Sequence, residues 1–360
     1  MNGKLRAINE AFCLSFFAVL ARSDLRSVFG VISAAVFAIA LVGQPASAGQ
    51  NTLAELKFHV QYNPFRVRRT LNFPRDYSLG ELFLSPTAAL PVDRDLIGAA
   101  RGTIIVPPGK FVTFVPAHRF YQAPEIIDTL PADGIDRLFL NSCAMDDAEE
   151  KFCDNVLARI SHLSSLLVLN LDRSSVTDIG AAHAKDLPAL QYLSAYGTLL
   201  NGSFIKQLAG HKTLRNLSLQ ETALTEQNMK YFALVPHLEH INIEHCNVAD
   251  AGLKNLIGCK NLLNLQLADN PKITDQSIPT VLTFKNLRMI TLSGTGMTNA
   301  GAMQLKKLPL RAIVMPVPVY DRKEQEKIRL AMPGISVSYT MRKRNKPVDA
   351  EVEKLYAPLH

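Results

Sequence analysis

The residues of this chain whose types and spacing could do chemistry gather around His245, which is followed directly by Cys246 and, thirteen residues further on, by Cys259. A histidine and two thiols could bind a metal ion or form a redox pair. A structural zinc site would place two cysteines about two to four residues apart, and that spacing is absent. Packing is the simpler interpretation of these three residues.

Further histidines and a carboxylate lie just before this segment, at His237, His240 and Glu244. On a strand, His240 and Glu244 would be separated by about 13 Å. One metal ion could not bind both of them. We therefore predict no metal and no cofactor.

Catalytic motifs are also missing from the sequence. There is no G-x-S-x-G, no H-E-x-x-H and no phosphate-binding glycine loop, and spacing nominates no set of Ser, His and Asp. An enzyme is not expected. The alternative is a hydrolase or ligand-binding activity in residues 49–132, where the histidines are His59 and His118, neither of them in a recognisable setting.

The elements that must position all these residues are the units of a repeat. The pattern L-x-x-[LI]-x-L, with Ala or Met at its last position in two copies, recurs at spacings of 24, 24, 24, 24, 25 and 23 residues, and an earlier copy begins at Ile135. The regular copies begin at Leu166, Leu190, Leu214, Leu238, Leu262, Leu287 and Leu310. A period of this length indicates a solenoid in which each unit adds one strand.

Each unit continues in the same way after its strand. The ninth position holds a small residue, the eleventh is apolar, and Thr, Asp or Asn follows. The ninth-position residues are Cys143, Ser174, Thr198, Thr222, Cys246, Asn270 and Thr295. Small polar side chains can bond the backbone of a turn, and Thr, Asp and Asn cap helix N-termini, so a turn and a short helix are predicted after each strand.

The repeat resembles leucine-rich repeats, of the bacterial kind similar to the cysteine-containing and ribonuclease-inhibitor-like subfamilies. VADAGLKNL (248–256) and MTNAGAMQL (297–305) are close to the V/I-T-D-x-G-L-x-x-L segment of that family, whereas LNGSFIKQL (200–208) departs from it. The resemblance covers Ile135 to about Tyr339. It implies an α/β solenoid that binds a partner, with parallel strands on the concave face and short helices on the convex face.

The position of each cysteine in the repeat limits its pairing. Cys143 and Cys246 share the ninth position four units apart, roughly 19 Å at about 4.8 Å per strand, which exceeds the limit of about 7 Å between the Cα atoms of a disulfide. Cys143 and Cys153 are the better disulfide candidate, since a bond there would hold the irregular first unit, and buried packing is the alternative. Cys246 and Cys259 are expected to be buried and reduced.

A signal peptide is predicted at residues 1–48. Val28–Val42 is an apolar run of fifteen residues, preceded by arginines and followed at 46–48 by the A-x-A pattern of a cleavage site. An uncleaved anchor would usually need about 20 apolar residues. The mature chain is expected to begin at Gly49 and to be exported, either periplasmic or secreted, with a membrane tether through an uncleaved leader as the alternative.

Residues 49–132 are predicted to be a β-rich cap or small domain before the solenoid at 133–340. Gly102–Val115 is predicted to form a hairpin, because Pro108 and Gly109 suit the two central positions of a type II turn. A solenoid needs a polar cover over its first core unit. A cap is the plain interpretation, and an independent ligand-binding domain is the alternative.

The concave face is the predicted partner-binding surface. The third, fifth and seventh positions of each unit point to it, because successive strand residues alternate between the two faces. These positions are mostly polar and uncharged, which suits a protein or a glycan, and a solvated face without a partner is the alternative. The residues predicted to bind are Tyr192, Tyr196, Asn216, His240, Asn242, Glu244 and Gln266.

The net charge of +7 is a mild excess for 360 residues. The basic runs lie at 65–69 and 342–346, the second of them in a basic C-terminal tail at 341–360. Solvated surface or tail is the simpler interpretation of both runs, so no nucleic-acid partner is predicted. The sequence does not indicate an oligomeric state.

Overall fold

The computed structural model describes residues 66–88, 95–141 and 152–339. The predicted signal peptide, Cys143 and the basic C-terminal tail lie outside these residues. Within the described ranges, no helix is long and apolar enough to cross a membrane.

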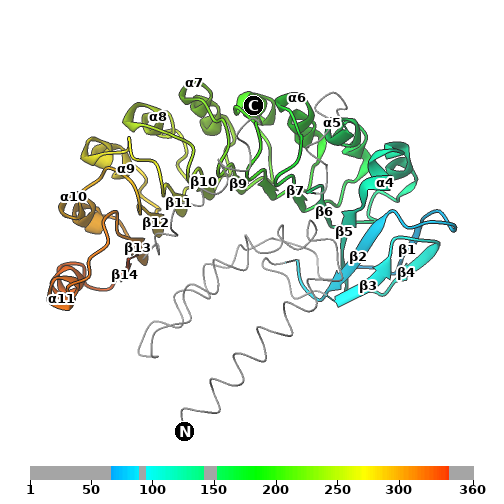
Figure 1. Ribbon diagram of the computed structural model, residues 1–360, viewed down its shortest axis with the longest axis horizontal. Coiled ribbons are helices and arrows are strands. Elements are labelled where there is room, and N and C mark those ends of the chain that lie inside the picture. The colour runs from blue at the N-terminus through cyan, green and yellow to red at the C-terminus, as the bar shows by residue number, and fades with distance from the viewer. Residues whose placement is uncertain (1–65, 89–94, 142–151, 340–360) are drawn as a thin grey trace, which may run out of the picture.

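The described chain forms a curved solenoid, with a sheet along its concave side and helices along its convex side (Figure 1). Twelve of the described strands make this sheet, in the order β14-β13-β12-β11-β10-β9-β8-β7-β6-β5-β2-β3, and neighbours from β5 to β14 are parallel. The parallel strands are β5 (Phe111–Pro116), β6 (Arg137–Phe139), β7 (Val168–Asn170), β8 (Tyr192–Ser194), β9 (Asn216–Ser218), β10 (His240–Asn242), β11 (Asn264–Gln266), β12 (Met289–Thr291), β13 (Ala312–Val314) and β14 (Ser336–Ser338). The predicted α/β repeat solenoid is confirmed.

Short helices return the chain along the convex side of each unit. The α-helices are α4 (His118–Tyr121), α5 (Phe152–Leu157), α6 (Asp178–Ala181), α7 (Glu226–Met229), α8 (Asp250–Lys254), α9 (Ile278–Val281), α10 (Asn299–Met303) and α11 (Arg322–Ala331). The 3-10 helices are η1 (Pro124–Thr129), η2 (Ile160–His162), η3 (Ala182–Asp186), η4 (Ser203–Leu208), η5 (Lys230–Leu234), η6 (Asp275–Ser277) and η7 (Gln304–Lys307). Only a 3-10 helix forms at 200–208, where the sequence departs from the family segment.

The repeated leucines form the core and fix the register of the sheet. Leu262, Leu265 and Leu267, at the first, fourth and sixth positions of one unit, are all 0% exposed. Residues at the same position of successive units lie opposite one another. Asn264 lies opposite Met289 although their units are 25 residues apart, so the loop between the strands absorbs the extra residue.

The ninth-position side chains hold the turn after each strand, as predicted. Ser174, Thr198, Thr222 and Thr295 each donate a hydroxyl hydrogen bond of 2.7–2.9 Å to the carbonyl three residues earlier. All four side chains are buried. A small hydroxyl donor thus holds the turn in these four units, whereas Cys246 at the same position donates to the carbonyl of Leu219 in the preceding unit.

Asn270 occupies the ninth position of its unit and makes more hydrogen bonds than the hydroxyl residues do. Its Nδ2 donates to three backbone carbonyl groups at 2.9–3.3 Å. Its Oδ1 accepts from the backbone N–H groups of Cys246 and Val248, at 3.1 and 2.9 Å, in the preceding unit. One buried amide thus joins two neighbouring turns.

In the six units that begin at Leu166 through Leu287, the eighth position has a left-handed backbone, with φ between 53° and 72°. The residues there are Arg173, Gly197, Glu221, His245, Asp269 and Gly294. For a residue with a Cβ, this conformation costs roughly 1–2 kcal/mol. His245 therefore belongs to a turn shared by the units, and its side chain is exposed.

An acidic side chain at the start of one helix binds the cap of the next unit. Asp275 accepts from the N–H and the hydroxyl of Thr298, at 2.9 and 2.8 Å, and Thr298 caps its own helix by accepting from the N–H of Gly301. A methyl group at Gly301 would collide with the Asp275 carboxylate. Asp250 binds Thr274 in the same way and does not cap its own helix, so the prediction that Thr, Asp or Asn after the eleventh position caps each helix is wrong for this unit.

The N-terminal strands extend the sheet of the solenoid. β2 (Gly80–Ser85) pairs antiparallel with β5 and with β3 (Asp95–Ala99), while β1 (Arg69–Asn72) and β4 (Thr103–Val106) form a separate antiparallel pair. The buried residues of these strands share one core with the repeats. These strands therefore pack against the first unit of the solenoid, and the role of residues 49–132 as a cap stays a prediction.

The predicted hairpin at Gly102–Val115 is wrong. Both strands form, and Gly109 has the positive φ, 72°, that a type II turn requires. However, β4 pairs with β1, whereas β5 pairs with β2 and β6. The turn preference is local, but the choice of partner strand depends on distant residues.

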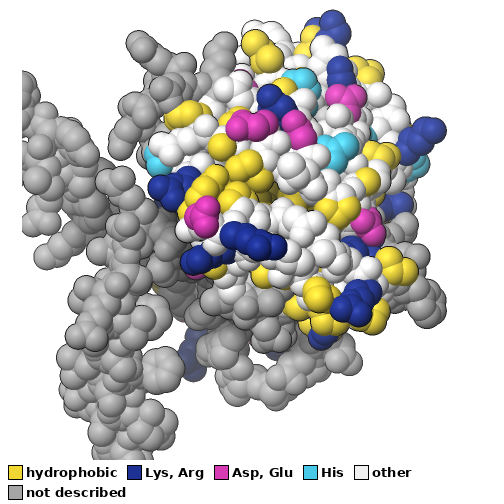
Figure 2. Space-filling view, turned by 90° about the vertical axis from the view of Figure 1, so that its right-hand side faces the viewer, with side chains coloured by type: hydrophobic (Ala, Val, Ile, Leu, Met, Phe, Trp, Pro, Cys, Tyr) yellow, Lys and Arg dark blue, Asp and Glu magenta, His cyan; other side chains and the backbone are white. Residues whose placement is uncertain are grey.

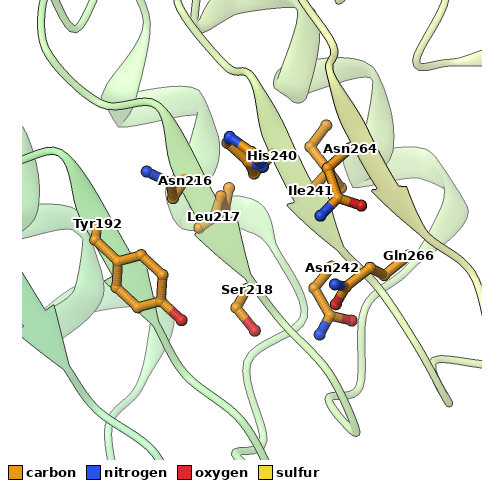
Figure 3. Close-up of a pocket in the computed structure, with 9 residues that line it drawn as sticks. All are labelled: Tyr192, Asn216, Leu217, Ser218, His240, Ile241, Asn242, Asn264 and Gln266. Atoms are coloured by element: carbon orange, nitrogen blue, oxygen red, sulfur yellow. The ribbon is translucent and has the colours of Figure 1, made fainter. Parts of the chain in front are cut away.

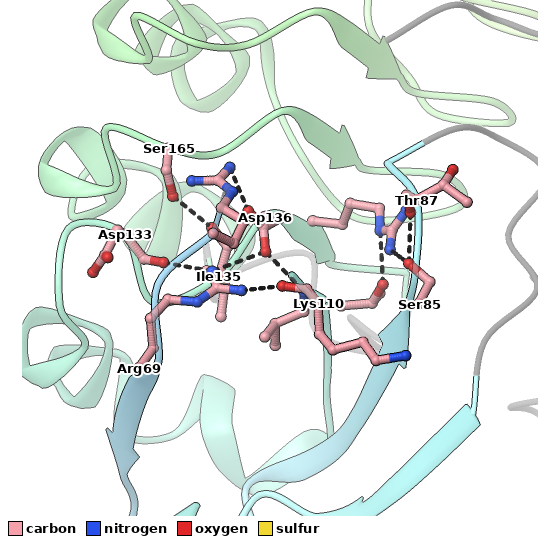
Figure 4. A network of polar contacts seen from close by, with 12 residues as sticks. Arg69, Ser85, Thr87, Lys110, Asp133, Ile135, Asp136 and Ser165 are labelled. Carbon is pink, nitrogen blue, oxygen red and sulfur yellow. Dashed lines mark hydrogen bonds and ion pairs between the residues drawn. The ribbon is translucent and has the colours of Figure 1, made fainter. Parts of the chain in front are cut away.

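A buried ion-pair network ties the N-terminal strands to the first unit (Figure 4). Asp136 is 0% exposed, pairs with Arg66 and with Arg69 (2.9 Å), and accepts from the N–H of Val112 at 2.8 Å. Two arginines of the basic run at 65–69 are thus used inside the fold. Solvated surface was the wrong interpretation for them.

Candidate partner-binding site on the concave face

Two rows of side chains cross the middle of the concave face, because equal positions of successive units lie opposite one another. The third-position row consists of Tyr192, Asn216, His240 and Asn264. The fifth-position row consists of Ser194, Ser218, Asn242 and Gln266. Figure 3 shows most of these side chains on the same side of strands β8 to β11.

A shallow hollow lies along these rows. Its cavity volume is about 30 Å³, whereas small-molecule sites usually have about 300–1,000 Å³. The residues that line it are Tyr192, Asn216, Leu217, Ser218, His240, Ile241, Asn242, Asn264 and Gln266. None of these is Asp, Glu, Lys or Arg, so the hollow offers hydrogen bonds without ion pairs.

Two asparagines in the hollow have incomplete hydrogen bonding. Asn216 is 2% exposed and Asn264 is 4% exposed, and the Oδ1 atom of each has no hydrogen-bond partner among the described residues. Most buried polar atoms in proteins are paired, because leaving one unpaired costs about 1–3 kcal/mol. Both oxygen atoms are shielded from solvent, so the accessible part of the hollow is formed by its other polar side chains.

Polar groups just beyond the hollow are bonded to one another. The Oδ1 atom of Asn242 accepts from the N–H of Glu244 at 3.0 Å, and the Glu244 carboxylate accepts from the hydroxyl of Thr291 at 3.0 Å. Glu244 is 8% exposed and does not line the hollow. These contacts fix the positions of Asn242 and Glu244 before any partner arrives.

The two predicted tyrosines have different surroundings. Tyr192 lines the hollow and packs against a buried cluster that includes Phe111 and Val168, and burial raises the pKa of its hydroxyl. Tyr196 lies outside the hollow. Its hydroxyl accepts from Arg173 at 3.0 Å, and the guanidinium lies 5.1 Å from the centre of its ring.

The structure brings most of the predicted binding residues together. Those that line the hollow are Tyr192, Asn216, His240, Asn242 and Gln266, whereas Tyr196 and Glu244 lie outside it. Sequence reasoning missed Asn264 and Ser218 as site residues. Their positions, third and fifth in their units, were the signal that could have found them. The binding role of the whole set stays a prediction.

The thiols and imidazole around His245 do not form a joint site. Cys246 donates to the carbonyl of Leu219 at 2.9 Å, and both Cys246 and Cys259 are buried without a disulfide, as predicted. Burial raises the pKa of both thiols, that of Cys259 to about 12, so both stay protonated at neutral pH. In the described ranges, no cluster of three or more His, Cys, Asp or Glu could hold a metal.

The predicted pairing of Cys143 with Cys153 stays a prediction. Cys153 is buried on α5. Cys143 lies outside the described residues, so the structure gives no distance between the two sulfur atoms.

The strand, the turn and the convex helix recur along the solenoid. This is a leucine-rich repeat fold. The chain is similar to the solved structure of an internalin (InlF) from Listeria monocytogenes, with 16% identity and a TM-score of 0.39 over 62% of this chain and 61% of that chain. It is also similar to internalin C2 from the same organism, with 19% identity and a TM-score of 0.41 over 55% of this chain and 92% of that chain.

Comparisons of the sequence itself gave no match. No protein-family model matches the chain, and no curated protein matches it.

Proposed function

We propose that this chain is a non-enzymatic binding module and that a protein partner binds its concave face at the hollow across β8 to β11. The polar, uncharged lining of this hollow carries this proposal, because its amide, hydroxyl and imidazole groups lie in two rows on one face of adjoining strands. The sheet beneath holds these side chains in place, so little ordering is needed on binding.

The lining of the hollow favours a macromolecular partner. The hollow is small and open for a drug-sized ligand, and its lining has amide, hydroxyl and imidazole groups but no charged pair. Such groups suit polar atoms on a protein surface, with Tyr192 and His240 as the large side chains among them. A glycan is the alternative occupant that amide and hydroxyl rows could bind.

A nucleic-acid partner is disfavoured. Arg66 and Arg69 pair with Asp136 inside the fold. Figure 2 shows the N-terminal end of the solenoid, where basic, acidic and hydrophobic side chains are interspersed and no continuous basic surface appears. Nucleic-acid sites need clustered Lys and Arg to neutralise phosphates.

We propose further that residues 1–48 direct export, so that the partner is met in the periplasm or outside the cell. The apolar run at Val28–Val42 and the A-x-A pattern at 46–48 support this. The resemblance to bacterial cysteine-containing and ribonuclease-inhibitor-like repeats belongs to the same proposal. N-terminal sequencing of protein from the native host should give Gly49 as the first residue, and an intact leader in the membrane fraction would contradict cleavage.

Site-specific photo-crosslinking in the native host tests the binding surface. A photoreactive residue replaces either Ser218, which lines the hollow, or Lys254, which is exposed on α8 of the convex side. We expect a protein adduct from Ser218 that does not form from Lys254 and that is lost in the His240→Ala variant.

The other outcomes separate the alternatives. An adduct from Lys254 alone, or none from Ser218, would show that the concave face is not the binding surface. An adduct at Ser218 that contains sugar and no peptide would replace the protein partner by a glycan.

A further inference from the structure

We propose that the chain docks on anionic phospholipid membranes through one edge of its last repeat units, formed by the loops that lead from the convex helices into strands β11 to β14. We call this surface the loop edge. Its basic residues are Lys260, Lys285, Arg288, Lys306, Lys307 and Arg311. None of them lines the concave hollow, so this inference goes beyond the proposed function and does not depend on it.

Charge is distributed unevenly along the solenoid. Residues 152–251 include nine acidic and seven basic residues, whereas residues 252–339 include five acidic and twelve basic ones. Between Asp275 and Asp321, a stretch of almost two units, there is no Asp or Glu at all. The basic residues of this stretch therefore have no acidic neighbour along the chain to offset their charge.

The fold places basic residues of successive units side by side. The backbone N–H of Arg311 donates to the carbonyl of Arg288 at 2.7 Å, so the two arginines directly precede adjacent strands at the same level. The Nη1 atom of Arg288 also donates to the carbonyl of Pro309 at 3.1 Å, which places this guanidinium against the loop that carries Lys307.

The preceding loop is joined to this group in the same way. The side chain of Asn286, next to Lys285, donates to the carbonyl of Lys260 at 3.1 Å. Neighbouring strands lie about 4.8 Å apart, so three successive units cover roughly 10 Å. Salt screens charges over about 8–10 Å, so these cations act together on a charged surface.

The lysines of the loop edge are available to such a surface. Lys260, Lys285 and Lys307 are all exposed. The ion pairs among the described residues involve other side chains, so none of these three lysines is paired with a described carboxylate. Each Lys or Arg near an anionic leaflet strengthens binding by roughly fivefold.

Exposed aliphatic side chains lie among the cations. Ile257, three residues before Lys260, is 39% exposed, and Leu330 is 71% exposed. The Nζ atom of Lys306 donates to the carbonyl of Ala331 at 3.4 Å, which places this lysine beside the end of α11 where Leu330 lies. Lysines mixed with exposed aliphatic groups suit the boundary between lipid headgroups and acyl chains.

Other anionic partners fit this composition less well. Single-stranded nucleic acids stack on aromatic rings, and Phe284, the aromatic residue of the loops into β11 to β13, is 1% exposed. Protein interfaces are depleted in Lys and enriched in Arg and aromatic residues. Four of the six basic residues here are lysines, which favours a membrane over both alternatives.

Vesicle sedimentation with the full chain tests the inference. The vesicles contain phosphatidylglycerol and phosphatidylcholine in equal amounts, or phosphatidylcholine alone. We expect the Lys260→Gln, Lys285→Gln, Lys307→Gln variant to bind the anionic vesicles at least about tenfold more weakly than the parent, because three charges are lost. The difference should shrink as salt is added, since salt screens the attraction.

The matched control removes the same charge from the convex side. Lys206, Lys230 and Lys254 are exposed on η4, η5 and α8, and replacing all three by Gln should change binding by less than about twofold. All six positions are exposed, so neither variant should affect folding. Every protein compared has the same residues 1–65 and 340–360, so any binding by these segments is common to all.

The apolar contribution has its own readout. Leu330→Asn should weaken binding to anionic vesicles severalfold without changing its dependence on salt, because it removes apolar contact and no charge. Equal binding of anionic vesicles by the loop-edge and convex variants would overturn the inference. Loss of binding to a DNA duplex or to an acidic protein in the loop-edge variant, with vesicle binding unchanged, would also overturn it by assigning the edge to another partner.

Discussion

Asn264 and Asn270 belong to one repeat unit, and their identical side chains are in opposite situations. Asn270 is 0% exposed, and its amide both donates and accepts, linking two turns. Asn264 is 4% exposed, and its Oδ1 atom has no partner among the described residues. The first amide has all its partners within the chain, whereas the acceptor of the second has none among the described residues.

The two asparagines show that buried amides of one repeat unit can differ in whether their hydrogen bonds are satisfied. A buried polar group whose hydrogen bonds are satisfied stabilises the fold, and its removal leaves several unpaired partners. A buried polar group whose hydrogen bonding is incomplete costs stability instead. Substitutions at the two kinds of position should therefore change stability with opposite signs.

The largest loss of stability is expected where the satisfied buried group is charged. Asp136→Ala should lower the free energy of unfolding by about 3–5 kcal/mol, because it leaves Arg69, with a side chain 2% exposed, without its counter-charge. Urea unfolding of the full chain followed by circular dichroism measures it.

Asp128→Ala is the matched control for Asp136→Ala. Asp128 pairs with Arg159 on the surface, where the two side chains are 47% and 43% exposed, so the loss should stay below about 1 kcal/mol. Equal losses in the two variants would contradict a structural role for the Asp136 network.

The second largest effect is expected for Asn270→Ala, which should lower the free energy of unfolding by about 2–4 kcal/mol. The backbone N–H and carbonyl groups that Asn270 now bonds would stay buried without partners. Asn270→Thr should lose less, since threonine holds the same turn at Thr198, Thr222 and Thr295. Thermal unfolding compares the two variants. If threonine is as costly as alanine, the bonds to the preceding unit matter more than those within the turn.

Asn264→Leu should change stability in the opposite direction, with a gain of about 1 kcal/mol, because it removes a buried acceptor that has no partner and keeps the volume. Asn216→Leu should gain less, since it also loses the bond to the Gln191 carbonyl. Denaturant midpoints of the two variants measure the order. A loss in Asn264→Leu similar to that in Asn270→Ala would remove the distinction between the two asparagines.

The smallest expected effects are on the pH dependence of stability. The pKa of one carboxyl group is raised by folding and the pKa of another is lowered, so their contributions to stability change with pH in opposite directions. Burial raises the pKa of Asp172 despite hydrogen bonds from Ser194 and Tyr196. The folded chain therefore holds this proton more tightly than the unfolded chain, so Asp172 stabilises the fold below about pH 4 and loses that contribution as the pH rises through the folded pKa.

For Asp250, burial alone would raise the pKa, but hydrogen bonds from Ser277 and Thr274 outweigh it and lower the pKa. Its stabilisation is present above about pH 4 and is lost as the pH falls through the folded pKa. Melting temperatures between pH 3 and 7 test both residues. Relative to the parent, the melting temperature of the Asp172→Asn variant should be highest at neutral pH. The melting temperature of the Asp250→Asn variant, relative to the parent, should be highest at acid pH.

Much of this fold could be predicted because the repeat leaves a periodic record in the sequence. Leu262, Leu265 and Leu267 are buried as their spacing indicates, and the small ninth residue bonds the turn. The hairpin prediction failed because the Pro108-Gly109 turn is local, whereas the pairing of β5 depends on β2 and β6. Periodicity gives the register of like units, and it says nothing of the strands that cover them.

The candidate site was predictable in outline only. The period places Asn216 and Asn264 in one row, and both are plain polar residues in the sequence. Whether an amide oxygen finds a donor depends on atoms of neighbouring strands, as the bond from Asn216 to Gln191 shows. The use of Arg66 and Arg69 was hidden for the same reason, since their partner Asp136 lies far along the chain.

The contact from Asp250 to Thr274 and from Asp275 to Thr298 uses the same atoms at each step and joins only adjacent units. A unit of this kind recognises its neighbour by residue type and needs nothing from the ends of the solenoid. An in-frame duplication of one unit would therefore insert a copy that finds its partners ready on both sides. Duplication or deletion of whole units can thus widen or narrow the concave surface, while the N-terminal strands and the last strand stay as they are.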